Sequence, residues 1–190
     1  MATLTNVPTQ PIQPTVQAVA NPAPLGLAAF ALTTFILSMA NAGLIPKAAE
    51  SVFLGAALAY GGVTQLCAGM WEFRRNNTFA ATAFSSYGGF WISLALLVWF
   101  FLPKDPSAVP AGVGIFLLAW SIFTLYMTYE ARKHAKPVYV TFLLLAPTFF
   151  LLAFGALFHA TVLTTIGGYL GILTAVAAWY ASYDALSKSS

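Results

Sequence analysis

Charged residues are scarce in this sequence. It contains 8 Lys and Arg residues and 5 Asp and Glu residues, so charged residues make up 7% of the 190, while 59% are hydrophobic. A soluble domain carries about 25% charged residues. The composition therefore excludes an ordinary water-soluble domain and predicts an integral membrane protein, with the lipid bilayer as its surroundings.

The residue types that build enzyme sites are equally rare. With a lone cysteine, Cys67, no intrachain disulfide can form and a Cys/His metal site is implausible. The sequence has no nucleotide-binding loop, catalytic triad or metal-ligand spacing. His134 and His159 fall in predicted turns, where solvated histidines are commoner than proton switches. We therefore expect no enzyme activity, no cofactor and no bound metal.

Long charge-free segments are abundant instead. A membrane-spanning helix needs about 20 apolar residues, and the charge-free interval 137–183 is long enough for two helices with a turn around Gly155–Thr161. The predicted spans are 25–44, 51–71, 79–102, 110–129, 138–155 and 163–183. The expected fold class is an all-α integral membrane protein with six transmembrane helices. One transmembrane domain would cover 21–185, between a disordered tail at 1–20 and a short tail at 186–190.

The distribution of Lys and Arg predicts the orientation. An even number of spans places both termini on one side of the membrane. That side receives Arg74, Arg75, Arg132, Lys133, Lys136 and Lys188, whereas the other side receives Lys47 and Lys104. Cytoplasmic loops carry the excess of cations, so both tails are expected in the cytoplasm and the helices in the plasma membrane. This topology explains the net charge of +3 without a nucleic-acid partner.

Polar residues within the predicted spans indicate helix faces that are shielded from lipid. The first predicted helix carries a weakly polar stripe of Phe30, Thr34, Ser38 and Asn41. Gln65 lies inside the second, where its amide must either pair with another helix or line a path. On the fifth, Thr141, Leu145 and Thr148 fall in line, and Pro147 predicts a kink. These faces are candidates for lining a transport path.

Small residues form a row along the sixth predicted helix. The row consists of Thr164, Gly168, Gly171, Ala175, Ala178 and Ser182. Such rows let helix backbones pack closely in a bilayer, so packing within or between protomers is the favoured interpretation. A path-lining role, with Ala178 as the candidate, is the alternative.

The segment from Asn21 to Leu27 stands where the polar tail meets the first apolar stretch. Asparagine is a favoured N-cap, and a proline such as Pro22 is tolerated at the first helical position. Pro24 and Gly26 would also let another backbone approach closely. We interpret the segment as a rigid helix start and, alternatively, as the mouth of a pore.

Four motifs in this order resemble the acetate uptake transporter family, the succinate–acetate permeases. The motifs are Asn21-Pro22-Ala23-Pro24-Leu25-Gly26-Leu27; Tyr60-Gly61-Gly62 with Gln65; Ala68-Gly69-Met70-Trp71-Glu72-Phe73; and Asn77-Thr78-Phe79 continuing through Thr82-Ala83-Phe84-Ser85-Ser86-Tyr87-Gly88-Gly89-Phe90-Trp91. The resemblance covers residues 21–185. Asn76, where the family usually has glycine, and Pro147 depart from its pattern.

The resemblance implies six helices per protomer, a homohexameric ring, and a separate path through each protomer for acetate and, in some members, succinate. It also implies a narrow hydrophobic constriction, which maps onto Phe30, Tyr87 and Leu145. Leu143 and Leu144 precede Leu145 directly, so they are the alternatives on the fifth helix. Asn21, Pro22 and Pro24 would form the mouth of the path.

A bare carboxylate at the middle of a bilayer costs several kcal/mol or more. With no Lys or Arg on the inferred path, we expect acetate to pass as neutral acetic acid or together with a proton. Phe30 and Leu145 would strip water, and the Tyr87 hydroxyl would offer one hydrogen bond to the carboxyl group. A hexameric channel for small neutral solutes such as urea or ammonia is one alternative, and a non-transporting scaffold or sensor is the other.

Overall fold

The computed structural model describes residues 19–46, 52–101 and 109–189. Residues 1–18, 47–51, 102–108 and 190 lie outside it, and with them most of the predicted N-terminal tail as well as Lys47 and Lys104. In the described residues the secondary structure consists of helices only: α1 (Ala23–Asn41), α2 (Val52–Leu58), η2 (Ala59–Thr64), α3 (Gln65–Arg74), α4 (Thr78–Leu96), η3 (Leu97–Phe101), α5 (Val109–Ala131), α6 (Lys136–Leu157) and α7 (Thr161–Ser187).

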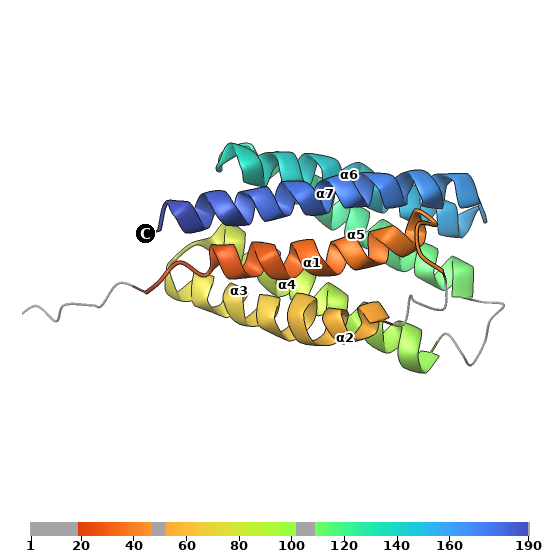
Figure 1. Ribbon diagram of the computed structural model, residues 1–190, viewed down its shortest axis with the longest axis horizontal. Helices are drawn as coiled ribbons and strands as arrows, with labels where there is room; N and C mark the ends of the chain where they lie inside the picture. Colours follow the sequence, from red (N-terminus) through yellow and green to blue (C-terminus); the bar gives the residue numbers. More distant parts are fainter. Residues whose placement is uncertain (1–18, 47–51, 102–108, 190) are drawn as a thin grey trace, which may run out of the picture.

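The helices make six segments that are long and apolar enough to cross a membrane. α2, η2 and α3 together form one span, Val52–Arg74, and α4 continues into η3 to form the next. All spans run along the long axis of the molecule (Figure 1). The prediction of six transmembrane helices is confirmed, and the observed ends differ from the predicted ones by a few residues.

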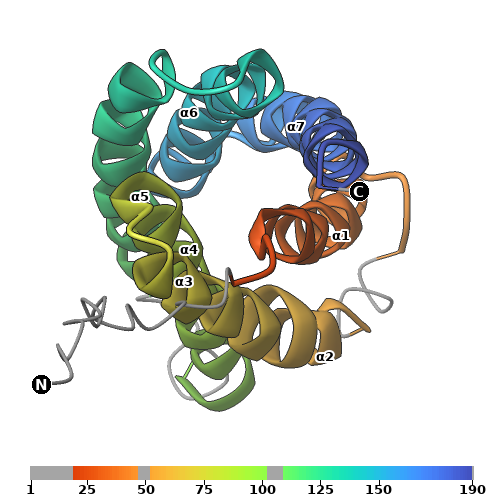
Figure 2. The same cartoon turned by 90° about the vertical axis from the view of Figure 1, so that its left-hand side faces the viewer.

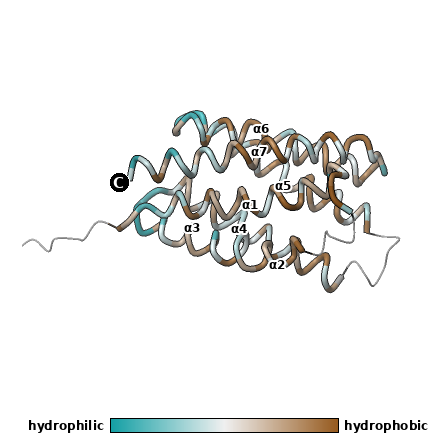
Figure 3. Tube along the Cα trace, viewed as in Figure 1, coloured by the Kyte–Doolittle hydropathy of each residue, from teal (hydrophilic) through white to brown (hydrophobic). Residues whose placement is uncertain are grey.

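Seen end on, the spans surround a common axis, with α1 beside α7 and α5 beside α6 (Figure 2). The start of α1 and the end of α7 lie at one end of the bundle, together with the turn between α5 and α6 (Figure 1). Hydrophilic residues gather at this end, and hydrophobic ones occupy the length of the spans (Figure 3). This end carries Arg74, Arg75, Arg132, Lys133, Lys136 and Lys188.

The small residues of α7 pack against α1. A Cβ added at Gly168 would collide with the backbone of Ala42, and one at Gly171 would collide with Ser38. The hydroxyl of Ser182 donates a hydrogen bond to the carbonyl of Pro24 at 2.7 Å. Packing within the protomer is therefore the observed role of this row, since close helix contact requires small side chains.

The second span contains a π-helical stretch that the sequence did not predict. η2 covers Ala59–Thr64 and includes Gly61 and Gly62. A Cβ at Gly61 would come within 2.5 Å of the Thr33 hydroxyl, and one at Gly62 within 2.5 Å of the Ala57 carbonyl. π-helical turns are often found at functional sites, and this one directly precedes Gln65.

The start of α1 differs in register from the prediction. The helix begins at Ala23, so Pro22 takes the N-cap position and Pro24 is the second helical residue. Asn21 lies one residue further out, and its Oδ1 accepts a hydrogen bond from the backbone N–H of Ala23 at 3.2 Å. The neighbour that approaches Gly26 is the ring of Phe84, 2.8 Å from where a Cβ would lie, and not another backbone.

Candidate substrate path

Two adjoining cavities lie inside the bundle. The larger, which we call the proximal chamber, has a volume of about 280 Å³ and is lined by Asn21, Phe30, Gln65, Arg75, Asn77, Tyr87, Thr141 and Leu145, among others. The smaller, the distal chamber, has about 40 Å³ and is lined by Phe30, Thr34, Ser38, Asn41, Trp91, Leu145 and Thr148, among others. Both linings are mostly apolar, as expected of a small-molecule site.

Phe30 and Leu145 belong to the linings of both chambers. Tyr87 lies beside them on the proximal side, with its ring centroid 5.5 Å from that of Phe30. All three side chains are buried. The structure thus brings together the three residues of the predicted constriction, at the boundary between the chambers.

The choice among the three leucines of α6 follows from the same geometry. Leu143 is 49% exposed on the outside of the bundle, whereas Leu145 is buried against both chambers. Leu144 lines neither chamber. Of the three, Leu145 is therefore the one that lines both chambers together with Phe30.

Wider cavities lie beyond each chamber. One of about 570 Å³, at the end that holds Val19 and Ser189, shares Asn21 and Arg75 with the proximal chamber. Another, of about 560 Å³ and lined by His159, shares Asn41 with the distal chamber. Because neighbouring cavities share lining residues, the four follow one another from one end of the bundle to the other, and the smallest of them is the distal chamber, whose lining includes Phe30 and Leu145.

Gln65 brings a polar group to the proximal chamber. Its side chain is 1% exposed, and neither its Oε1 nor its Nε2 has a hydrogen-bond partner in the described part of the chain. The predicted alternative of an interhelical hydrogen bond is therefore not observed. A buried amide without partners costs about 1–3 kcal/mol, so this group is available to a passing solute or to water.

The distal chamber carries the polar stripe of α1. Thr34, Ser38 and Asn41 all line it, as the helical spacing predicted, and the Thr34 Oγ1 has no partner among the described residues. The hydroxyl of Thr148 also lines it but donates to the Leu144 carbonyl at 2.8 Å. Ala178 is part of the apolar core and lines none of these four cavities.

Two further residues, Trp91 and Thr124, lie near the constriction and were not among the predicted path residues. Trp91 lines the distal chamber, and its buried Nε1 has no partner in the described part of the chain. Thr124 of α5 is completely buried, and its Oγ1 lies 2.9 Å from the hydroxyl of Tyr87. Trp91 could have been found from its position one helical turn after Tyr87 on α4, whereas nothing in the pattern of α5 marked Thr124.

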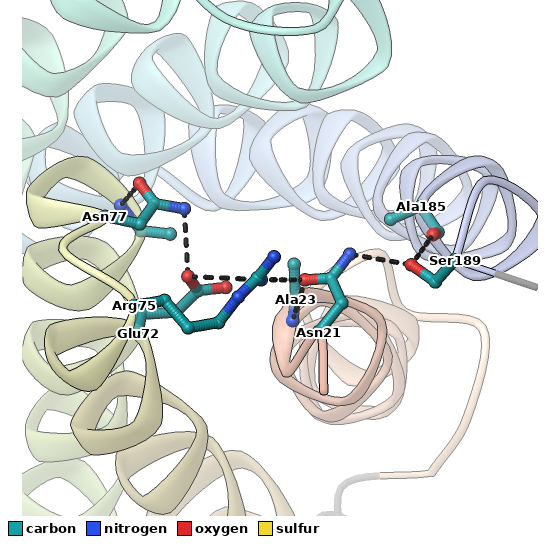
Figure 4. A network of polar contacts seen from close by, with 8 residues as sticks. Asn21, Ala23, Glu72, Arg75, Asn77, Ala185 and Ser189 are labelled. Carbon is teal, nitrogen blue, oxygen red and sulfur yellow. Dashed lines mark hydrogen bonds and ion pairs between the residues drawn. The ribbon is translucent and has the colours of Figure 1, made fainter. Parts of the chain in front are cut away.

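Asn21 connects three helices at the mouth of the proximal chamber (Figure 4). Its Oδ1 accepts a hydrogen bond from the guanidinium of Arg75, and its Nδ2 donates to the hydroxyl of Ser189 at 2.9 Å. Ser189 in turn donates to the Ala185 carbonyl at 2.7 Å. The predicted mouth residue therefore joins the start of α1 to the ends of α3 and α7.

Glu72 completes this network and corrects an expectation. From its place at a helix end we would expect a solvated carboxylate, but Glu72 is completely buried. Its Oε2 accepts a hydrogen bond from Asn77 at 2.9 Å and lies 3.7 Å from the Arg75 guanidinium. Asn77 also caps α4 by accepting from the N–H of Ala80, so the short turn between α3 and α4 folds over the carboxylate and excludes water.

The site offers no evident place for a metal. In residues 19–46, 52–101 and 109–189, no three His, Cys, Asp or Glu side chains lie close enough together to hold an ion. The lining of the two chambers is mostly aromatic, aliphatic, amide and hydroxyl, with Arg75 and His134 added in the proximal chamber, which suits a small organic solute.

Comparison with known proteins decides the family. The model of the GPR1/FUN34/yaaH family matches residues 4–190. The chain belongs to this family. Among the relatives, the ammonia transport outward protein 2 of Saccharomyces cerevisiae is 41% identical over 174 residues, which cover 88% of this chain and 62% of the yeast protein. The chain thus spans about three fifths of the length of that yeast relative.

A bacterial member of the family matches over most of both chains. The succinate-acetate/proton symporter SatP of Escherichia coli is 36% identical over 166 residues, 85% of each chain. The solved structure of the bacterial acetate channel SatP superposes with a TM-score of 0.82 at 32% identity, covering 87% of this chain and 91% of the other. The six-helix fold is therefore that of the solved family member, and the protein is an integral membrane protein.

Proposed function

We propose that this protein transports acetate across the membrane through its own six-helix bundle, with succinate and other small monocarboxylates as further candidate substrates. The observation that carries the proposal is the series of four neighbouring cavities along the bundle, with Phe30 and Leu145 at the boundary between the two inner ones. Its support is the likeness to a solved acetate channel and to a symporter of acetate and succinate.

The charges around the path favour passage of the neutral acid or of the anion with a proton. Two basic side chains, Arg75 and His134, line the proximal chamber, where the sequence led us to expect no Lys or Arg on the path. The Arg75 guanidinium is held by Asn21 and faces the buried Glu72, and the ring of His134 is stacked on Phe79. A desolvated carboxylate would therefore meet no unpaired arginine there, and its transfer would cost several kcal/mol or more. The Gln65 amide can donate a hydrogen bond to the carbonyl oxygen of acetic acid and accept one from the acid O–H, which suits the neutral acid.

The outer surface of the bundle supports our proposal for its membrane location, its oligomeric ring and its orientation. Apolar side chains of α5 and α7, such as Ile122, Leu125, Leu173 and Val176, are exposed and would face lipid or neighbouring protomers of a homohexameric ring. Both described chain ends and the six Lys and Arg residues named above lie at one end. We place that end on the cytoplasmic side of the plasma membrane, because cytoplasmic loops carry the excess of cations.

A channel for ammonia is a second candidate, since the yeast relative carries ammonia transport in its name. The narrow, mostly apolar boundary at Phe30 would also admit a small neutral molecule. Urea passage belongs to the same alternative, and a non-transporting scaffold or sensor is the remaining one.

The experiment is uptake by the purified protein in liposomes, with labelled acetate, labelled urea and an internal pH dye that reports ammonia. We expect acetate uptake that rises as the external pH falls from about 8 toward about 5, because the acid form gains population near the carboxyl pKa. Uptake of urea or ammonia without acetate would favour the channel alternative. No flux of any of these solutes above that of empty liposomes, with Phe30→Ala and Tyr87→Ala keeping the same assembly, would favour the scaffold.

A further inference from the structure

We infer that Tyr87 acts in the constriction through its ring, and that Thr124 is the positioning residue that holds this ring in place. The inference rests on the proposed function. It assigns a role to a residue of α5 that lines neither chamber. It also assigns the Tyr87 hydroxyl a partner other than the substrate.

The direction of the hydrogen bonds follows from counting protons. Thr124 has one hydroxyl hydrogen, and its Oγ1 donates to the Trp120 carbonyl at 2.8 Å. In the 2.9 Å contact between Tyr87 and Thr124, the tyrosine hydroxyl must therefore be the donor. Its single hydrogen is used in this bond. A carboxylate, which can only accept, would find no donor at Tyr87.

The location of the bond supports the same conclusion. Thr124 is completely buried and lies outside both chambers, so the Tyr87 hydroxyl is engaged on the side of α5. The ring of Tyr87 is packed against Phe30 at 5.5 Å and edge-on against Phe123 at 5.4 Å. What a solute meets at the boundary of the chambers is thus an aromatic ring held by its far end.

The bond also joins two helices. It connects α4 to α5 by a side-chain hydrogen bond in the described part of the chain. One turn later, the Thr128 hydroxyl donates to the Thr124 carbonyl of its own helix at 2.7 Å, with the Phe142 carbonyl of α6 as a second, longer acceptor at 3.1 Å. The bond from Thr124 is therefore the one that ties the ring of Tyr87 to α5. Removing the Thr124 hydroxyl leaves the buried Tyr87 hydroxyl without an acceptor. Because an unpaired buried donor is costly, we expect the Tyr87 side chain to shift until its hydroxyl reaches another acceptor.

A shift of the Tyr87 ring is expected to change the width of the constriction more than the affinity for acetate. We expect Thr124→Val to shift the ratio of acetate to propionate uptake by about tenfold, the range typical of one methylene in a fitted pocket, with KM for acetate within about twofold of the original. Thr124→Ser retains the acceptor and should restore the original ratio. Tyr87→Phe should shift the ratio as Thr124→Val does, and the double variant should shift it no further, because the two groups act as one unit.

The matched control is Ser121→Ala. Ser121 is also completely buried on α5, one turn earlier, and its hydroxyl donates to the Leu117 carbonyl of its own helix at 2.8 Å. Its removal should leave the ratio unchanged. An infrared tyrosine C–O band that is lost in Tyr87→Phe and shifted in Thr124→Val would report the bond itself, independent of any transport.

Two results would overturn the inference. A KM for acetate that rises about tenfold or more in Tyr87→Phe, with Thr124→Val unaffected, would mean that the hydroxyl binds the substrate. Equal uptake ratios in all variants would mean that the bond serves folding only. If Thr124→Val fails to fold, Tyr87→Phe and Thr124→Ser still separate these outcomes. Wild-type protein that moves no acetate would instead refute the proposed function, while the infrared comparison would still test the hydrogen bond.

Discussion

At the scale of single residues, Gln65 is a buried side chain whose amide donor and acceptor both lack a hydrogen-bond partner among the described residues. Such a group is costly in a folded protein, at about 1–3 kcal/mol, unless a ligand or water satisfies it. Function and stability should therefore respond in opposite directions at this position, which separates a path-lining role from a structural one.

We predict that Gln65→Leu lowers acetate uptake by about tenfold or more, because the proximal chamber loses its free amide, while the unfolding temperature stays equal or rises as an unpaired buried group is removed. Uptake in liposomes and thermal unfolding in detergent measure the two effects. Ser93→Ala, which removes a hydroxyl bonded to the Phe90 carbonyl of its own helix, is the control. A less stable variant with normal uptake would mean that the amide is structural.

Leu145 sets the second prediction at this scale. Leu145→Ala should widen the boundary between the chambers and raise the uptake of propionate relative to acetate by about tenfold. Leu143→Ala removes the same atoms two residues earlier, from a side chain that is exposed, and should leave the ratio unchanged. Competition of labelled acetate with unlabelled propionate measures it. Equal effects of the two substitutions would contradict a constriction at Leu145.

At the scale of helices, the contact between α1 and α7 holds one wall of the path. Gly168 and Gly171 let the two backbones approach at Ala42 and Ser38. α1 carries Phe30 and the polar stripe, so its distance from α7 decides where these side chains lie. Packing of this kind depends on van der Waals contact, since lipid offers no hydrophobic drive between helices.

We predict that Gly168→Ala destabilises the protein by about 1–3 kcal/mol, because the new Cβ meets the backbone of Ala42, which cannot move aside as a flexible side chain would. Gly112→Ala on α5 is the matched control. A Cβ at this position would have no neighbouring atom within 4 Å, and alanine favours a helix by about 1 kcal/mol relative to glycine. Thermal unfolding in detergent compares them. Equal loss in both variants would exclude a specific α1–α7 contact.

At the scale of the whole molecule, the proposed orientation places Ser189 and the α5–α6 turn in the cytoplasm and His159 outside. The prediction can be checked with single cysteines in a Cys67→Ser background. We expect Ser189→Cys to react with an impermeant maleimide only after the cells are permeabilised, and His159→Cys to react in intact cells, because His159 lies at the opposite end of the bundle. The reverse pattern would invert the topology.

The sequence predicted the spans well because a membrane demands about 20 apolar residues in a row, and this demand can be met only locally. The resemblance to a known family implied Phe30 and Tyr87 as constriction residues, and the structure places their rings side by side. The sequence predicted the N-cap of α1 one residue too early, since both asparagine and proline are tolerated at several positions there. It also placed Glu72 in solvent, because the turn that covers Glu72 is built by Arg75 and Asn77, three and five residues away.

The sequence by itself therefore determined the class of the protein, its six helices and the polar faces of α1, because hydropathy and helical period are properties of a single segment. Only the tertiary structure decided which leucine of α6 lines both chambers with Phe30, and that Gln65 has no partner on another helix in the described part of the chain. It also decided that the Tyr87 hydroxyl pairs with Thr124 and that the small residues of α7 pack against α1. These depend on how side chains from different spans interlock, and a helix rotated by one residue would turn about 100° and present other side chains to its neighbours.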